Sequence, residues 1–232
     1  MHIGSVMSFD PEKEVAMVAR LNHTNIVRFF GFAKESDTIF LVTKLVDGYD
    51  LSTILFRPIS GVTLGVADKN FIAFEAAVGL AYLHKQRIVH FDIKPFNFLI
   101  EWPSIKVRIC DLGVAGLRKK GRVTVTSVGR RGTTLYVAPE MFQRCDKTVF
   151  VDVWSYACVL VEVITEMLVW GDFDESEILC CLCRNPVRTP DVEDLPHRAK
   201  DLCTGCFALC PSKKPSMEVI VEQLLAVPLI EL

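Results

Sequence analysis

The sequence predicts an α+β fold, with a small β part near the N-terminus and a mainly helical part after it. Two observations lead to this prediction: β-branched and aromatic residues concentrate between residues 26 and 46, and apolar residues at helical spacing dominate the chain after residue 146. Half of the 232 residues are hydrophobic, which supports a large buried core and excludes a disordered chain. The 26 basic and 28 acidic residues leave a net charge of −2, so composition gives no indication of nucleic-acid binding.

The front of the chain predicts one helix and two strands. Asp10-Pro11-Glu12 is typical of a helix start, with a side-chain acceptor at the N-cap and proline at the first helical position, and this helix is expected to reach Leu21. Strands are expected over residues 26–31 and 38–46, joined by a short polar turn. Residues 67–84 carry a wide apolar face and predict a long helix.

The rest of the chain predicts two more strands and a series of helices. The strands are expected at 98–100 and 105–110, and a polar, basic loop at 118–132. Further helices are expected at 151–167, 175–183, 198–206 and 216–225.

The most apolar stretch, residues 149–170, is long enough to span a bilayer but contains three acidic residues: Asp152, Glu162 and Glu166. Each carboxylate would cost about 2.5–3.5 kcal/mol at the bilayer centre, so a buried helix is predicted, with no membrane partner. The N-terminus lacks the features of a signal peptide, and a cytoplasmic location with reduced thiols is expected.

The nine cysteines allow two interpretations. Cys180, Cys181 and Cys183 together with Cys203, Cys206 and Cys210 have the residue types of a zinc cluster. The last three, however, recur at three and four residues, which places them on one apolar helix face, where free cysteine behaves as a small hydrophobic residue. The second interpretation is favoured.

The strongest functional signal is a set of motifs in a fixed order. Residues 89–97, Val-His-Phe-Asp-Ile-Lys-Pro-Phe-Asn, place Asp92, Lys94 and Asn97 in one loop between a helix and a strand. Asp111-Leu112-Gly113 follows after another strand, and residues 132–140, Gly-Thr-Thr-Leu-Tyr-Val-Ala-Pro-Glu, end at Glu140. Each motif alone has an ordinary structural explanation, but together they resemble the catalytic loop, magnesium-binding loop and activation segment of the protein kinases. Lys94 and the Gly132-Thr133 pair resemble the Ser/Thr kinases rather than the tyrosine kinases.

The resemblance implies a two-lobed fold with a truncated small β lobe, residues 1–46, and a mainly helical large lobe, residues 47–232. It implies ATP and Mg²⁺ as cofactors and a protein as substrate. Asp92 would accept the proton of the substrate hydroxyl and Lys94 would stabilise the transferred phosphate. Asn97 and Asp111 would hold the metal ions through hard oxygen ligands. Thr133 would brace the catalytic loop.

Other residues receive roles through the same resemblance. Thr43, Lys44, Leu45 and Val46 would form the hinge that binds adenine, together with Leu99 on the following strand. Glu14 would belong to the regulatory helix, and Asp152 would cap the backbone of the catalytic loop. Glu140 would pair with Lys214, which stands where the family has arginine, so a looser anchor is expected.

The sequence also departs from the family. Phe91 replaces the arginine that reads a phosphate on the activation loop, so ordering through that contact is not expected, although Thr124, Thr126 and Ser127 are candidate phosphorylation sites. The basic loop either favours acidic substrates or is only a solvated segment. No Gly-x-Gly-x-x-Gly and no Val-Ala-x-Lys strand precedes Glu14, so the first three strands of the small lobe are expected to be absent.

Two functions therefore stay open: a protein Ser/Thr kinase, and a truncated or pseudokinase-type binding module without turnover. In either case the apolar residues around Val15, Val18, Phe40 and Val42 lack the strands that would cover them, and an exposed sheet edge is expected there.

Overall fold

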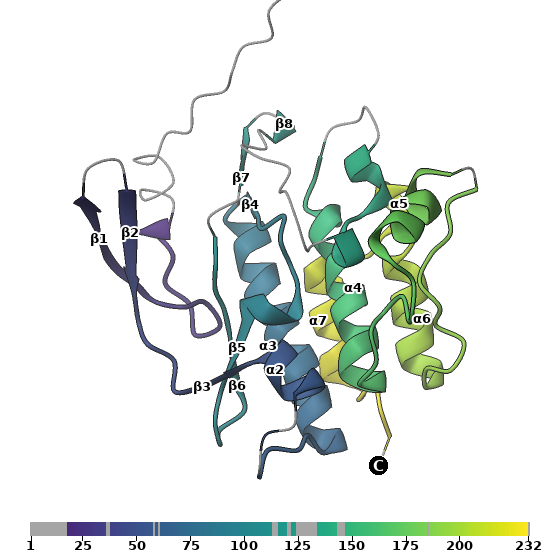
Figure 1. Cartoon of the computed structure of the whole chain (residues 1–232), viewed down its shortest axis with the longest axis horizontal. Helices are drawn as coiled ribbons and strands as arrows, with labels where there is room; N and C mark the ends of the chain where they lie inside the picture. Colours follow the sequence, from purple (N-terminus) through teal and green to yellow (C-terminus); the bar gives the residue numbers. More distant parts are fainter. Residues whose placement is uncertain are drawn as a thin grey trace, which may run out of the picture.

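The computed structural model describes residues 18–35, 38–57, 59, 61–112, 116–119, 122–123, 134–142, 147–184 and 186–231. These residues form a small sheet on one side and a helical lobe on the other (Figure 1), as the predicted α+β class requires. Most of the helix predicted up to Leu21 lies outside the described residues, as do Glu14, Gly113 and Thr133. In the described part of the chain, every helix is too short or too polar to cross a membrane.

The small sheet is an antiparallel pair, β1 (Phe29–Glu35) and β2 (Thr38–Thr43), that stands apart from the helices (Figure 1). The predicted first strand begins too early, because Ile26 bridges to Ile109 of the large lobe instead of joining β1. Successive strand residues point to opposite faces, so Phe40, 49% exposed, and Leu41, 47% exposed, place apolar surface on both sides. The expected exposure is thus found at the strands, whereas Val18 is buried in the core, which corrects that part of the expectation.

A second sheet has the order β3 (Gly48–Asp50), β5 (Phe98–Glu101), β6 (Lys106–Ile109), all antiparallel. Gly48 lies opposite Glu101, and a Cβ atom at Gly48 would sit 1.9 Å from the carbonyl oxygen of Ile100. Glycine is therefore required where β3 meets β5. At the end of β3, the side chain of Asp50 accepts a hydrogen bond from the amide of Thr53 (2.9 Å) and caps α2 (Leu51–Phe56), a helix that was not expected from the sequence.

The helical lobe is built around two long helices, α3 (Val66–Lys85) and α4 (Phe150–Thr165). Both agree with the predicted helices to within one or two residues at each end. The helix α5 (Glu175–Cys183) has the predicted bounds, while α6 (His197–Cys206) and α7 (Met217–Ala226) shift by one residue at one or both ends. The helix α3 packs against β6 on one side and against α4 and α7 on the other, so it joins the second sheet to the helices.

Short elements complete the lobe. The strand β4 (Ile88–Val89) pairs with β7 (Gly116–Lys119), which in turn pairs with β8 (Arg122–Val123). The segment predicted as one basic loop thus contains two strands among its described residues, because β4 offers β7 a pairing partner. The single-turn helices are η1 (Pro95–Asn97), η2 (Thr134–Tyr136), η3 (Pro139–Phe142) and η4 (Pro211–Lys213).

The cysteine pattern near the C-terminus follows the predicted helix face only in part. Cys203 and Cys206 are fully buried in α6. Cys210 is exposed, because α6 ends at Cys206 and the chain has left the helix before it reaches Cys210. Among the described residues there is no group of three or more possible metal ligands.

A buried ion pair joins the end of the activation segment to the C-terminal part of the lobe. The Nζ atom of Lys214 lies 2.5 Å from Oε1 of Glu140, and both side chains are almost inaccessible to solvent. The same Nζ donates to the carbonyl of Phe150 at 3.3 Å and lies 5.3 Å from the ring centroid of Trp154. Burial lowers the pKa of Lys214, while the charge and hydrogen bond of Glu140 oppose that shift.

A second buried carboxylate, Glu162 of α4, holds η2. The hydroxyl of Tyr136 donates to both oxygens of Glu162, at 3.2 and 3.0 Å, and the amide of Val169 donates to Oε1 at 3.1 Å. Burial raises the pKa of Glu162 to about 7, although both hydrogen bonds act in the opposite direction. The hydroxyl of Ser155 donates a further hydrogen bond of 2.7 Å to the carbonyl of Tyr136, so two side chains of α4, Ser155 and Glu162, bind η2.

Replacing Gly48 by alanine should break the junction of β3 and β5, because the new Cβ atom would overlap the backbone of Ile100. We expect Gly48→Ala to lower the free energy of unfolding by about 2 kcal/mol or more in urea denaturation. Gly31→Ala is the matched control, since a Cβ atom at Gly31 meets nothing within 4 Å, and its effect should stay within about 1 kcal/mol. Equal effects of the two variants would contradict the steric argument.

Replacing Lys214 by methionine should remove the buried ammonium group that lies 2.5 Å from the Glu140 carboxylate. Breaking a buried pair costs about 3–5 kcal/mol, so the melting temperature should fall by roughly 10 °C in scanning calorimetry. Lys213→Met removes a charge from the neighbouring exposed position and should change the melting temperature little. If the anchor is looser than the arginine version, as the sequence suggested, Lys214→Arg should raise the melting temperature.

The raised pKa of Glu162 links stability to pH. In the unfolded chain this group titrates near 4.5, whereas its folded pKa is about 7, so the folded state favours the protonated form. The stabilisation is complete below about pH 4.5 and is lost as the pH rises towards 7. Glu162→Gln should therefore flatten the fall of the unfolding midpoint between about pH 4.5 and pH 7, relative to the wild type. Glu222→Gln, at an exposed position on α7, should leave the profile parallel to that of the wild type, and parallel profiles for all three proteins would contradict the prediction.

Candidate functional site

The loop between β4 and β5 gathers three of the predicted site residues. The Nζ atom of Lys94 lies 2.7 Å from Oδ2 of Asp92. The amide nitrogen of Asn97 donates to the same oxygen at 3.2 Å and to the carbonyl of Asp92 at 2.6 Å. A single carboxylate oxygen thus accepts from a cation and from an amide. Asn97 is buried, while Asp92 and Lys94 are half-buried at the surface of the lobe.

The β5–β6 hairpin brings Asp111 to this cluster. Phe98 pairs with Ile109 in the antiparallel ladder, and the amide of Cys110 donates to the carbonyl of Asn97 at 3.0 Å. Asp111 therefore follows directly after a residue bonded to Asn97, although the two are far apart in the sequence. The side chain of Asp111 is exposed, so its carboxylate stands at the mouth of the site.

Asp152 fixes the start of the same loop from α4. Its Oδ2 atom accepts from the amide of His90 at 2.8 Å and its Oδ1 atom from the amide of Phe91 at 2.9 Å. The Nε2 atom of His84 lies 2.9 Å from Oδ2. Asp152 is fully buried in the first turn of α4, so the helix dipole and three donors compensate the desolvation of its charge.

Two residues of the site have left-handed backbone conformations that non-glycine residues rarely adopt: Phe91 has φ of 66° and Asp111 has φ of 57°. Such conformations persist only where the surroundings enforce them. At Phe91 the enforcing contact is the carboxylate of Asp152. Asp111 directly follows the end of β6 and the hydrogen bond from the amide of Cys110 to the carbonyl of Asn97.

The hydrogen bonds of His90 define its tautomer. Its Nδ1 atom lies 3.3 Å from the amide of Asp92 and can only accept, so the proton resides on Nε2. That Nε2 atom donates to the carbonyl of Cys110 at 3.0 Å. The histidine thus connects the backbone on either side of the site, next to Asp92 and next to Asp111.

The predicted hinge residues follow β2 and lead into β3. Thr43, Lys44 and Leu45 are exposed, Leu45 at 90%, and Val46 is half-buried. Pairing of β3 with β5 sets Gly48 opposite Glu101 and Asp50 opposite Leu99, so the predicted hinge enters the second sheet beside Glu101, whereas Leu99 lies nearer to Asn97. The strand β5 thus runs from the Asp92 cluster at its start to the predicted hinge at its other end.

Other predicted residues lie elsewhere or are not described. Glu140 contacts Lys214, and its carbonyl accepts from Lys147, so it anchors the activation segment in the helical lobe and is not part of the Asp92 cluster. Glu14 and Thr133 lie outside the described residues, so their assigned roles remain predictions.

Sequence reasoning missed three residues that shape the site: His84, His90 and Asp50. His84 and Asp152 are 68 positions apart, and nothing local signals their contact. His90 stands inside the recognised motif but received no role. Asp50 lies close enough to contribute, after burial and Asp111, to raising the pKa of the Cys110 thiol to about 11. Its place directly before an apolar helical segment is an N-cap signal that was available.

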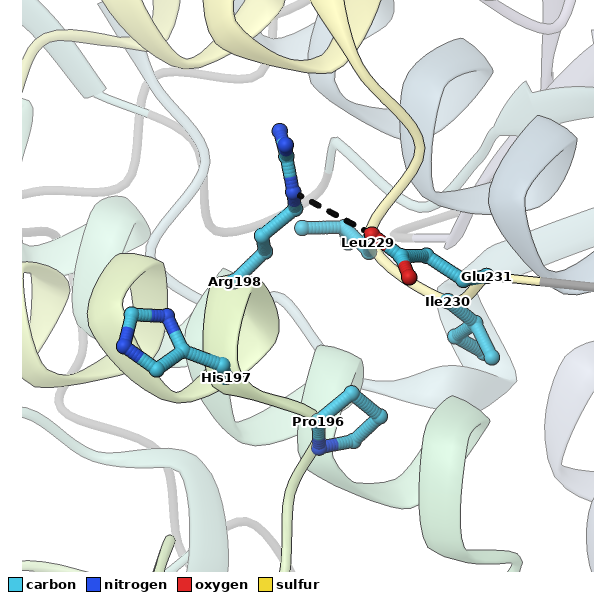
Figure 2. A pocket seen from close by; sticks show the side chains of 6 residues that line it. All are labelled: Pro196, His197, Arg198, Leu229, Ile230 and Glu231. Carbon is cyan, nitrogen blue, oxygen red and sulfur yellow. Dashed lines mark ion pairs between the residues drawn. The ribbon is translucent and has the colours of Figure 1, made fainter.

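A separate cavity of about 410 Å³ lies between the start of α6 and the C-terminal segment (Figure 2). It is bordered by the start of α6 and by the C-terminal segment, where Arg198 faces Glu231 at 3.7 Å. The residues around it are Pro196, His197, Arg198, Leu229, Ile230 and Glu231. None of the predicted site residues belongs to this set.

The Asp92 cluster combines a proton acceptor, the carboxylate of Asp92, with two side chains of the kind that bind metal ions, Asn97 and Asp111. The amide nitrogen of Asn97 is engaged with Asp92, so its Oδ1 atom is the end left to bind a cation. An amide oxygen and a carboxylate oxygen are hard donors of the kind that Mg²⁺ prefers. Asn97 and Asp111 therefore fit Mg²⁺, with Lys94 adding a positive charge on the side of Asp92.

Comparisons with known proteins find protein kinases as relatives of this chain. The chain is 30% identical over 220 residues to the dual specificity protein kinase shkA of Dictyostelium discoideum, covering 93% of this chain and 41% of that protein. It is 29% identical over 215 residues to mitogen-activated protein kinase kinase kinase 7 of Drosophila melanogaster, covering 91% of this chain and 31% of that protein. It is 28% identical over 214 residues to the serine/threonine-protein kinase CTR1 of Arabidopsis thaliana, covering 91% and 26%.

The chain thus spans less than half the length of each of these relatives. The family model described as "Protein kinase domain" matches residues 7–226, which is nearly the whole chain. With the site at the end of the second sheet and the helical lobe behind it, this match shows that the chain belongs to the protein kinase family.

Proposed function

We propose that this chain is a Ser/Thr protein kinase unit that binds Mg²⁺ and ATP and transfers the γ-phosphate to a hydroxyl group of a protein. The observation that carries the proposal is the convergence of Asp92, Lys94, Asn97 and Asp111 at the end of the β5–β6 hairpin. The names of the relatives, which include serine/threonine and dual specificity kinases, support the same reaction class.

In the proposed reaction, each residue has one task. Asp92 accepts the hydroxyl proton at Oδ2, and Lys94, 2.7 Å from that oxygen, keeps the carboxylate oriented and offers its charge to the phosphate. Asn97 and Asp111 hold Mg²⁺, which neutralises phosphate charge when bound. The backbone of Lys44 to Val46, with Leu99, takes the adenine. Asp152 acts through the loop backbone and is a positioning residue.

The two lobes are part of the proposal: residues 1–46 as the remnant of the small lobe and 47–232 as the large lobe, in a cytoplasmic protein. The residues proposed to carry turnover, Asp92, Lys94, Asn97 and Asp111, all belong to the large lobe.

A binding module without turnover is the second candidate, and one observation favours it. Thr43 and Leu45 are exposed, as are Phe40 and Val42 on β2, so apolar hinge and sheet surfaces are uncovered in this chain. The exposed side chains of the hinge would give a bound nucleotide few enclosing contacts among the described residues, which predicts weak affinity.

Titration with ATP and Mg²⁺ tests the proposed site. Thermal unfolding of the wild type should shift upward as Mg·ATP is raised, because a ligand that binds only the folded state stabilises it. Asp111→Asn should weaken binding by about tenfold or more, since it removes a charged metal ligand. Asp172→Asn, at an exposed position between α4 and α5, is the matched control and should bind like the wild type.

Phosphoryl transfer to a general protein substrate then separates the two candidates. Asp92→Asn should retain Mg·ATP binding but lower the transfer rate by roughly 10²–10⁴-fold, as expected for loss of a general base. Binding without transfer by the wild type would favour the binding module. Absence of any Mg·ATP-dependent shift would overturn the assignment of the nucleotide site itself.

A further inference from the structure

A cluster of charged side chains lies beside the hinge and takes no part in the proposed chemistry. It consists of Lys44 in the hinge, Glu101 at the end of β5 and Arg108 on β6. The Nε atom of Arg108 lies 2.6 Å from Oε1 of Glu101, and Nζ of Lys44 lies 3.5 Å from the same oxygen. We call these three residues the hinge cluster.

Arg108 reaches a fourth segment from the other end of its guanidinium group. Its Nη1 atom donates to the carbonyl of Thr24 at 2.7 Å, in the loop that enters β1. One planar side chain therefore joins the β5–β6 hairpin both to the segment before the small sheet and, through Glu101, to the segment after it. A two-ended contact of this kind needs the fork geometry of arginine, which lysine lacks.

We propose that Arg108 is a positioning residue that sets the hinge and the segment before β1 against the large lobe, through Glu101 and the carbonyl of Thr24. Only the predicted effect of Arg108 on nucleotide binding rests on the nucleotide site proposed above. The restraint of the hinge and of the segment before β1 is proposed for the protein without nucleotide.

Burial and charge distinguish the two ion pairs of the hinge cluster, Arg108–Glu101 and Lys44–Glu101. The side chains of Arg108 and Glu101 are 15% and 17% exposed, whereas Lys44 is 47% exposed. The hydrogen bond from Arg108 is the largest influence lowering the pKa of Glu101, with a smaller contribution from Lys44. Exposed ion pairs contribute little to stability and are screened by salt. The Arg108–Glu101 pair therefore provides most of the restraint on the hinge, and the Lys44–Glu101 pair adds a smaller contribution.

The position of the cluster explains how it acts on the site. Glu101 belongs to β5, the strand that carries Leu99 and directly follows Asn97. Arg108 pairs with Leu99 in the β5–β6 ladder. The strand at the floor of the adenine site is thus the same strand to which the hinge is fastened, so loss of Arg108 should change the distance between hinge and floor without removing any proposed ligand-binding group.

Three amides report on this restraint in the protein without nucleotide. The amide of Lys44 donates to the carbonyl of Arg28 at 2.8 Å, that of Val27 to Ile109 at 2.9 Å, and that of Trp102 to Asp47 at 3.0 Å. Hydrogen exchange followed by mass spectrometry should show these segments exchanging about threefold to tenfold faster in Arg108→Gln than in the wild type. The central part of α3 serves as the internal reference and should exchange at the same rate in both proteins.

Further variants separate charge from bridging. Lys106→Gln removes a positive charge from the same strand at an exposed position with no ion pair to Glu101 among the described contacts, and should match the wild type. Glu101→Gln should behave like Arg108→Gln in the hinge segment. Arg108→Lys retains the charge but should restore protection only in part, because one ammonium group cannot reach both acceptors.

Binding of Mg·ADP completes the test. Arg108→Gln should raise its Kd by about threefold to tenfold, and raising the salt concentration to about 0.5 M should weaken binding to this variant, which retains only the exposed Lys44 contact, more than binding to the wild type. Hinge and Thr24-segment exchange in Arg108→Gln equal to that in Lys106→Gln would overturn the positioning role. If the wild type bound no Mg·ADP, the nucleotide site would be wrong, and the exchange result would still decide the role of Arg108.

Discussion

The buried carboxylate of Asp152 is the interaction on which the site depends most. It turns the backbone at His90 and Phe91 into a conformation that a phenylalanine would otherwise avoid, and this turn is what directs Asp92 to the surface. A charge can be buried here because it lies in the first turn of α4 and has His84 as a further partner. Without the Asp152 carboxylate, the loop between β4 and β5 would not hold Asp92 in its present position.

The helix α4 serves as a rigid support in more than one place. Along its length it presents Asp152 to the loop before β5, Ser155 and Glu162 to η2, and Trp154 to Lys214. The segments that it contacts come from distant parts of the chain. Nearly every residue of this helix is buried, so its polar residues are explained by the segments they hold and not by contact with water.

Much of this fold could be predicted from sequence because apolar residues recur at helical spacing in helices such as α4 and α5. The short elements could not. The strand β7 exists because β4 offers it a partner, so it has no strong local pattern, and α2 has a single N-cap residue, Asp50, as its local signal. The gathering of Asp92, Asn97 and Asp111 was anticipated through motif resemblance alone. The contacts of His84 and Glu162 depend on tertiary packing and leave no trace in residue spacing.

The uncovered hairpin of β1 and β2 has a consequence for cooperativity. A pair of strands with apolar side chains on both faces gains little burial of its own, and its residues contribute few contacts to the core of the helical lobe. Its opening free energy should therefore be well below that of global unfolding, so that the hairpin forms a separate low-stability unit next to a cooperative lobe. A single unfolding midpoint would then describe the lobe, and a ligand or protein that covered the hairpin would join the two into one cooperative unit.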